Sequence, residues 1–320
     1  MSKFARVLIA WQRRRGRKGL PWQGTREPYR IWLSEVMLQQ TQVAAVIPYY
    51  ARFLGKYPTV EALAAASEED VLTLWAGLGY YARGRNLHAA ARIIAQRGFP
   101  RTQEEIAELP GVGRSTAAAI AAFAFGERAA ILDGNVKRVL SRGFGIERQA
   151  HLWELAERLL PRNGIEAYTQ ALMDLGATVC TRTKPRCDEC PIRATCVARK
   201  EGRVEELPTP RQRKPLPQKE VTWLVLRHGR EVLLEKRPSP GIWGGLWCFP
   251  EAQKDAKGTL LAPLEHSFTH FRLRIHPLLK ELGNKPLRAE SPARLWLDLE
   301  DAAGAAIPTP VRKLIARLAG

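Results

Sequence analysis

Residues 109–117 read Leu-Pro-Gly-Val-Gly-Arg-Ser-Thr-Ala and join a short helical pattern to an alanine-rich one. The two glycines, Gly111 and Gly113, permit a tight turn whose backbone N–H groups face outward. Together with the N-terminus of the following helix, such a turn forms a cradle for an anion. The stretch predicts a helix-hairpin-helix motif over about 102–125, which would hold a DNA phosphate without reading sequence. An ordinary corner between two helices is the alternative.

The surrounding sequence divides into a helical part and a strand-rich part. Residues 1–200 read as almost entirely helical, and 31–54 reads as one long amphipathic helix. Residues 201–219 contain four prolines without periodicity and are typical of a linker. Short β-rich runs follow at 221–226, 231–235, 246–249, 266–275 and 294–298, with a closing helix at 309–318. We expect an all-α domain over 1–200 and an α+β domain over 220–320.

The charge of the chain is strongly positive. Its formal net charge is +18 over 320 residues, and 1–219 hold 35 Lys and Arg against 21 Asp and Glu, a net of +14. Such a balance points to a polyanion as partner, most simply a nucleic-acid backbone, although an arginine-rich solvated surface would look alike. No apolar run is long enough for a membrane span, and no secretory signal is present, so we expect a cytoplasmic protein.

Four of the five cysteines lie within seventeen residues, in the pattern C-x6-C-x2-C-x5-C. Thiolates grouped so closely in a cysteine-poor chain are more typical of metal or cluster ligands than of disulfides. Zinc sites usually combine two close pairs, whereas an all-cysteine set with irregular spacing also suits a cubane iron–sulfur cluster. Spacing alone leaves both open. The candidate ligands are Cys180, Cys187, Cys190 and Cys196.

Two carboxylates are candidates for catalysis. Glu35 borders the apolar stripe of its predicted helix, where a carboxyl group can have a raised pKa and act as a proton donor. Asp133 precedes a predicted helix and taken alone reads as its N-cap. A pair with one member protonated and one ionised suits cleavage of a bond to an anomeric carbon through an oxocarbenium-like state. An isolated glutamate of this kind is more often only solvated.

Several segments together carry a family resemblance. WLSEVMLQQTQV, LWAGLGYYARGRNLH, LPGVGRSTA, ILDGNVKRVL, ALMDLGA and the cysteine set occur in this order over residues 17–196. The chain strongly resembles the adenine DNA glycosylases of the MutY family, in the endonuclease III-like helix-hairpin-helix superfamily, and 220–320 resemble their Nudix-like domain. The resemblance implies an all-α helix-hairpin-helix glycosylase domain with a [4Fe–4S] cluster in 180–196, followed by an α+β Nudix-like domain.

The resemblance also implies roles for individual residues. Glu35 corresponds to the general acid that protonates adenine, Asp133 to the carboxylate that stabilises the sugar cation, and Asn135 to the residue that orients Asp133. The implied DNA contacts fall into four further groups. Gln40 and Tyr80 match side chains wedged into the base stack, Thr41 and Leu78 match positions near the oxidised guanine, Gln170 contacts the extruded adenine, and Gly111, Gly113 and Ser115 belong to the hairpin. Without the resemblance, core packing is the favoured interpretation of Leu78 and Tyr80.

Ser115 is informative because related bifunctional enzymes carry a lysine there. A serine cannot form an imine, so we expect water as the nucleophile and no strong strand-nicking activity. In the second domain, Phe268-Thr269-His270 resembles the loop that reads 8-oxoguanine, where Phe-Ser-His is the commoner form. Nothing in 220–320 resembles the clustered glutamates of a Nudix hydrolase, so this domain should bind rather than hydrolyse.

These observations favour a monofunctional enzyme of base excision repair. Its expected substrate is double-stranded DNA with adenine opposite 8-oxoguanine or guanine, and we expect it to act as a monomer. A non-catalytic iron–sulfur protein that senses lesions is the main alternative, and it would have no need of the Glu35–Asp133 pair. A nucleotide-pool hydrolase lacks its glutamates, and a pyrimidine glycosylase with lyase activity would not carry Ser115.

Overall fold

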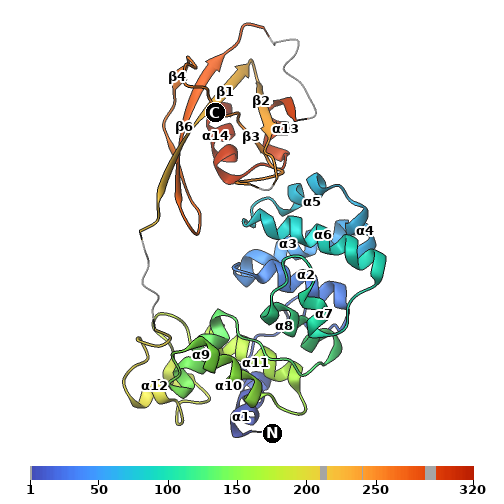
Figure 1. The fold of residues 1–320 in the computed structure, drawn as a ribbon, viewed down its shortest axis with the longest axis vertical. Coiled ribbons are helices and arrows are strands. Elements are labelled where there is room, and N and C mark those ends of the chain that lie inside the picture. Colours follow the sequence, from blue (N-terminus) through green and yellow to red (C-terminus); the bar gives the residue numbers. More distant parts are fainter. Residues whose placement is uncertain (1, 210–214, 240, 285–292) are drawn as a thin grey trace. The chain divides into compact units, whose positions relative to one another are not determined.

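The computed structural model describes every residue except 1, 210–214, 240 and 285–292. The chain forms two compact units (Figure 1). The first comprises Met1–Ala65 and Asn86–Gln212, and the second comprises Ala66–Arg85 and Arg213–Gly320. The chain therefore passes between the units at three places. Among the described residues, no helix is both long and apolar enough to cross a membrane.

The first unit is helical, as the sequence predicts. One of its hydrophobic clusters lies among α1, α8, α9, α10 and α11, where small alanines of α8 allow neighbouring helices to approach closely. Its helices are α1 (Lys3–Arg15), α2 (Pro28–Leu38), α3 (Val43–Lys56), α4 (Val60–Ala65), α7 (Gln103–Ala107), α8 (Arg114–Phe125), α9 (Gly134–Phe144), α10 (Gln149–Leu159), α11 (Ile165–Thr178), the 3-10 turn η1 (Cys187–Glu189) and α12 (Val197–Lys200).

The expectation of one long helix over 31–54 is wrong. The helix ends at Leu38, and a new one begins at Val43. Between them Gln40 adopts a left-handed backbone with φ of 58°. The backbone of a residue other than glycine is strained in this region of conformational space. The apolar stripe continues across the break, which is why periodicity alone does not reveal it.

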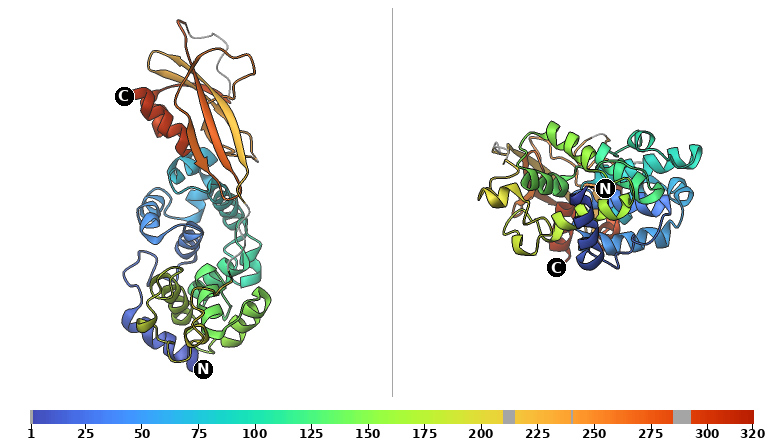
Figure 2. Two further views of the ribbon diagram at one scale, coloured as in Figure 1. Left: turned by 90° about the vertical axis from the view of Figure 1, so that its left-hand side faces the viewer. Right: turned by 90° about the horizontal axis from the view of Figure 1, so that it is seen from below.

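The second unit contains a mixed sheet (Figure 2). Its central pair, β1 (Gln218–His228) and β6 (Arg272–Glu281), runs parallel, with Val225 opposite Leu279. Antiparallel pairing adds β2 to β1, β3 and β7 to β2, and β4 and β5 to β6. The remaining elements are β2 (Glu231–Lys236), β3 (Trp247–Cys248), β4 (Thr259–Leu260), β5 (Leu264–Ser267), β7 (Arg294–Asp298), α13 (Leu299–Gly304) and α14 (Thr309–Ala319).

One expected strand of this sheet is in fact a hairpin. The sequence predicts a single strand over 266–275, but β5 ends at Ser267 and β6 begins at Arg272. The turn between them is closed by the Phe268 N–H donating to the Phe271 carbonyl at 2.9 Å. The break therefore presents 268–270 at a hairpin tip. The α+β class of this unit is confirmed.

Helix α5 (Glu68–Trp75) and the start of α6 (Tyr81–Arg97) also belong to the second unit. Leu72 of α5 is fully buried in the same core as Trp223, Val225 and Leu314. This core lies between the sheet and the helices α13 and α14. Residues 66–85 are thus far from the rest of this unit in sequence, yet they complete its hydrophobic core.

Candidate active site and cluster-binding loop

Glu35 lies on α2, a helix that starts from an N-cap at Glu27 with Pro28 in its first turn. Its neighbours Ser34 and Val36 are buried, and Glu35 itself is partly buried. Burial, with a smaller contribution from the negative charge of Asp133, raises the pKa of Glu35 to about 8, while Arg17 acts in the opposite direction. A carboxyl group with this pKa is protonated at neutral pH and can donate a proton.

Asp133 is both an N-cap and the partner of Glu35. Its Oδ1 accepts hydrogen bonds from the backbone N–H of Asn135 at 2.9 Å and of Val136 at 2.7 Å. Burial raises its pKa, whereas these two hydrogen bonds and the charge of Arg138 lower it in part. The capping bonds fix the carboxylate at the start of α9. The structure therefore brings together the two carboxylates that the sequence singles out.

Arg17 and Asp174 belong to the same site, and the sequence does not single them out. Arg17 Nε donates to Asp174 Oδ1 at 2.7 Å, and the Arg17 backbone N–H donates to Oδ2 at 3.0 Å. Gln170 Nε2 donates to the same Oδ1 at 2.9 Å. Asp174 is fully buried, so its charge needs this pairing. An acidic residue within the apolar run ALMDLGA is the signal that could have revealed it.

Arg138 links Asn135 to the cysteine loop. Its Nη2 donates to Asn135 Oδ1 at 2.8 Å and its Nε to the Cys180 carbonyl at 2.6 Å. Asn135 also lies directly against Gly176, where an added Cβ would come within 2.5 Å of the Asn135 Cβ. Asn135 is thus held between α9 and α11, although Arg138 and Gly176 were not predicted to take part.

The four clustered cysteines line one cavity, together with apolar residues of α9 and α11. None of the four forms a disulfide. Burial raises the pKa of Cys190 to about 12, and a cysteine binds metal as its thiolate. A cubane cluster needs one thiolate on each of its four irons, and the four cysteines that line this cavity can supply them.

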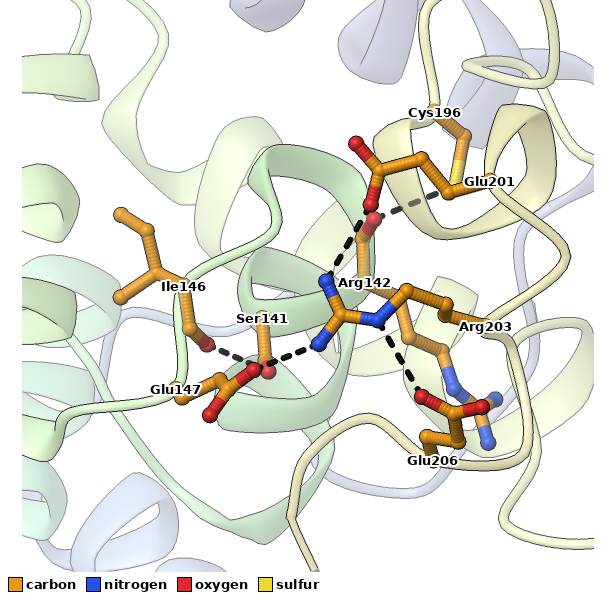
Figure 3. Close-up of polar contacts among 8 residues, drawn as sticks. All are labelled: Ser141, Arg142, Ile146, Glu147, Cys196, Glu201, Arg203 and Glu206. Atoms are coloured by element: carbon orange, nitrogen blue, oxygen red, sulfur yellow. Dashed lines mark hydrogen bonds and ion pairs between the residues drawn. The ribbon is translucent and has the colours of Figure 1, made fainter.

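Arg142 holds the cluster-binding loop in place, and Arg203 forms ion pairs in the segment that follows this loop. Buried Arg142 donates to the carbonyls of Thr181 at 2.7 Å and Leu207 at 2.8 Å, and its Nη1 lies 3.5 Å from Cys180 Sγ. Exposed Arg203 forms ion pairs with three glutamates (Figure 3). These glutamates are Glu147, Glu201 and Glu206. Cys196 Sγ lies 3.3 Å from the Arg142 carbonyl oxygen, and Figure 3 draws this contact.

The hairpin at 109–113 has the expected geometry. A capping box between Thr102 and Glu105 starts α7, and Gly111 turns the chain with φ of 77°. A Cβ at Gly111 would meet Asn86 at 2.8 Å, so only glycine fits. Gly113 is the N-cap of α8 and has no side chain to cover its first N–H groups. Ser115 Oγ accepts from the Leu132 N–H at 2.9 Å, which places it beside the segment that leads to Asp133.

The remaining predicted DNA contacts lie on turns with unusual backbones. Tyr80 has φ of 49° and a side chain that is 48% exposed, so core packing does not account for it. Leu78 is buried, as its packing interpretation predicts. Gln40 is exposed in the turn between α2 and α3, and the Thr41 N–H bonds the Leu38 carbonyl there. Gln40 and Tyr80 belong to different units.

The turn at 268–270 combines a packed aromatic side chain with exposed polar groups. Phe268 stacks on Phe271 with ring centroids 4.4 Å apart and contacts Trp243 at 5.4 Å. Thr269 and His270 are exposed. The Thr269 hydroxyl lies 3.4 Å from Nδ1 of His270. The tip can therefore offer polar groups to a partner while the Phe268 ring stays packed.

Comparison with known proteins follows the order of these elements. Residues 33–162 match the HhH-GPD superfamily of base excision DNA repair proteins, 180–196 the iron–sulfur binding domain of endonuclease III, and 221–317 the NUDIX domain. The iron–sulfur match resolves the choice that cysteine spacing leaves open. A thermostable thymine-DNA glycosylase superposes with a TM-score of 0.58 at 31% identity, over 62% of this chain and 95% of its own.

Two relatives cover almost the whole chain. An adenine DNA glycosylase of Buchnera aphidicola subsp. Baizongia pistaciae is 35% identical over 98% of this chain and 96% of its own length. The adenine DNA glycosylase of Homo sapiens is 34% identical over 98% of this chain and 73% of its own length. Both helical and strand-rich units are included in these alignments. The chain therefore belongs to the adenine DNA glycosylase family of base excision repair enzymes, with an iron–sulfur cluster in 180–196.

Proposed function

We propose that this protein removes adenine mispaired with 8-oxoguanine or guanine from double-stranded DNA, as a monofunctional glycosylase. It would act as a monomer in the cytoplasm, at the nucleoid. The observation that carries the chemistry is the pair Glu35 and Asp133, in which the pKa of Glu35 is raised to about 8. A binding protein without catalytic activity would have no use for a buried proton donor beside a carboxylate.

In the proposed reaction the two carboxylates have separate tasks. Glu35 donates its proton to the adenine ring, so that the base leaves as a neutral molecule when the N-glycosidic bond breaks. The ionised Asp133 stabilises the positive charge that develops on the sugar. Water then adds to C1′ and gives its proton to the Glu35 carboxylate, which restores the starting protonation state. Asn135, held by Arg138, would keep the Asp133 carboxylate in place.

The adenine must leave the base stack before it can reach these groups. We propose that Gln40 and Tyr80 wedge into the stack, because both are exposed on strained left-handed turns. Thr41 and Leu78 would lie near the oxidised guanine, and Gln170 would contact the extruded adenine. Backbone N–H groups at the N-terminus of α8, which Gly113 leaves without a side-chain cap, would bind a phosphate.

The monofunctional assignment rests on Ser115. Its hydroxyl accepts a hydrogen bond from the Leu132 N–H, next to Asp133. Ser115→Lys would bring an amine to this place, so a borohydride-trappable covalent DNA complex should appear in the variant. Ser115→Ala is the matched control without an amine. Equal trapping by the parent protein would mean that another lysine serves as nucleophile and that the assignment is wrong.

The lesion would be read by 268–270. 8-Oxoguanine carries an N7–H donor where guanine has an acceptor, and the exposed Thr269 hydroxyl can answer that donor. Thr269→Ala should reduce the preference for A:8-oxoguanine over A:G by roughly tenfold to a hundredfold, because one hydrogen bond to a buried donor is lost. Thr259→Ala, at another exposed threonine of the same sheet, is the control.

The decisive measurement is single-turnover release of adenine from duplexes that differ only in the base opposite adenine. Fast release opposite 8-oxoguanine, slower release opposite guanine and little opposite thymine is the expected order. Tight binding to all three without release would instead identify a lesion-sensing DNA-binding protein.

A further inference from the structure

The segment 66–85 belongs to the same compact unit as the sheet that carries 268–270. This segment contains α5 and the turn 77–80, whose last residue is the exposed Tyr80. The residue proposed to wedge into the base stack and the loop proposed to read the lesion are therefore parts of one folded body. The question is which contacts join them.

Glu69 of α5 makes the strongest polar connection. Its Oε2 accepts from Lys236 Nζ at 2.8 Å, and its Oε1 accepts from Trp247 Nε1 at 2.6 Å. Burial raises the pKa of Glu69, but these two hydrogen bonds outweigh it and hold the pKa below its ordinary value. Both oxygens of one carboxylate thus bind neighbouring residues of β2 and β3, which are paired with each other.

Further contacts join this segment to the loop 241–246, which precedes β3. Leu72 packs so closely on Gly245 that a Cβ there would lie 3.2 Å from Leu72 Cδ1. Arg85 Nη1 donates to the Gly244 carbonyl at 2.6 Å. The loop is therefore held on one side by α5 and by the first turns of α6.

On its other side the same loop supports the lesion-reading turn. Trp243, with a left-handed φ of 56°, packs its ring against Phe268 at 5.4 Å and against Trp223 at 5.8 Å. Phe268 is the packed base of the turn that presents Thr269. Contacts therefore run without interruption from α5 through 241–246 to 268–270.

We propose that Glu69 is a positioning residue for lesion discrimination, which ties the Tyr80 turn to the 268–270 turn through Lys236 and Trp247. The inference rests on the proposed function of those two turns. When 268–270 binds 8-oxoguanine, the attached segment 66–85 is placed with it, so Tyr80 enters the stack at the lesion. With guanine in that position the turn is not engaged, and Glu69 contributes little.

The test uses the full-length protein and the ratio of single-turnover rates on A:8-oxoguanine and A:G duplexes. Glu69→Ala should lower this ratio by about tenfold, since two hydrogen bonds to a charged group are lost. The rate on A:G should stay near that of the parent. The control is Thr73→Ala, which removes an exposed hydroxyl from the same helix α5. A merely structural role would reduce the folded fraction, lower both rates equally and leave the ratio intact.

A second variant acts from the other side of the contact. Trp247→Phe keeps an aromatic ring and removes the Nε1 donor, so it should lower the ratio less than Glu69→Ala does. In the double variant the two effects should not add, because they remove the same contact. If Thr269→Ala lowers the ratio but Glu69→Ala leaves it unchanged, this inference is overturned and the lesion-reading function stands. If Thr269→Ala also leaves it unchanged, the lesion-reading function itself fails.

Discussion

The site around Glu35 and the turn around Thr269 are both proposed to touch a base, yet their surroundings are opposite. Glu35 is withdrawn among buried residues, and its pKa depends on that burial. Thr269 is exposed at a hairpin tip, and only the neighbouring Phe268 ring is packed. Proton donation requires that water be excluded, whereas reading a base inside a duplex requires reach. The two proposed tasks thus impose different physical demands.

The largest effect is expected on the rate of adenine release when Glu35 is replaced. Glu35→Gln keeps the size of the side chain but removes its proton, so adenine release should slow by about 10²–10⁴-fold. Duplex affinity should stay close to that of the parent in a gel-shift titration. Glu61→Gln, an exposed residue of α4, serves as control. A rate near that of the parent would remove Glu35 from the mechanism.

The pH profile sharpens the same side of the comparison. Since Glu35 donates only when protonated and its pKa is about 8, the single-turnover rate should fall above that pH, by about tenfold per pH unit. Thr269→Ala should show the same pH profile, although its ratio of rates on A:8-oxoguanine and A:G duplexes should differ from that of the parent. A rate that keeps rising through pH 9 would contradict a proton donor with this pKa.

On the other side, Phe268→Ala should disturb both packing and discrimination. Loss of the ring removes contacts with Phe271 and Trp243, and we expect the free energy of unfolding to fall by about 1–3 kcal/mol. Chemical denaturation measures this loss, and the preference for A:8-oxoguanine should decline with it. Phe268→Leu retains much of the side-chain volume, so its stability and its preference for A:8-oxoguanine should lie between those of the parent and of Phe268→Ala. An unchanged preference in a destabilised variant would show that the Phe268 ring does not support recognition of 8-oxoguanine.

The burial of Glu35 should also have a cost in stability. Its pKa in the folded state is about 8, against an ordinary value of 4.5, so between these pH values the folded protein holds a proton that the unfolded chain releases. Stability from this group is therefore present at low pH and lost as pH rises through 8. At pH 9, Glu35→Gln should have a larger free energy of unfolding than the parent, by on the order of 1 kcal/mol for each unit of pKa shift, and therefore a higher Tm. The difference should close near pH 4, and an equal Tm at pH 9 would argue against the shift.

The smallest effect is expected at the exposed ion pairs of Arg203. Although Arg203 meets three glutamates, charges on the surface are well solvated and contribute little. Arg203→Ala should lower Tm slightly at low salt and not at high salt. Iron content should be unchanged. A large loss that persists at high salt would mean that this network holds the cluster-binding loop more firmly than its exposure suggests.

The sequence predicted most of this architecture because its signals are local. Helical periodicity, the glycine spacing at 111 and 113, and the cysteine pattern all depend on residues near one another. The two failures, at 39–42 and 268–271, occur where apolar periodicity continues through a turn. Neither turn contains glycine or proline, so the usual breaking signals are absent. Both turns carry residues proposed to contact DNA, and local rules often fail at functional sites.

The supporting residues of the site were missed for a different reason. Arg17 and Asp174 are 157 positions apart, and nothing in either segment announces the other. The membership of 66–85 in the strand-rich unit is equally non-local, since Glu69 meets Trp247 across 178 positions. Such pairs depend on how the elements pack. Periodicity and motif spacing carry no information about that packing.

The three chain crossings between the units have a consequence for protein engineering. A chimera that exchanges only 213–320 with a homologue would place a foreign sheet against the native Leu72 and Glu69, and the core would meet a mismatched helix. An exchange that carries 66–85 along with 213–320 transfers the whole folded body. The natural exchangeable module is thus discontinuous in sequence. A cassette cut at the proline-rich linker would leave one of its helices behind.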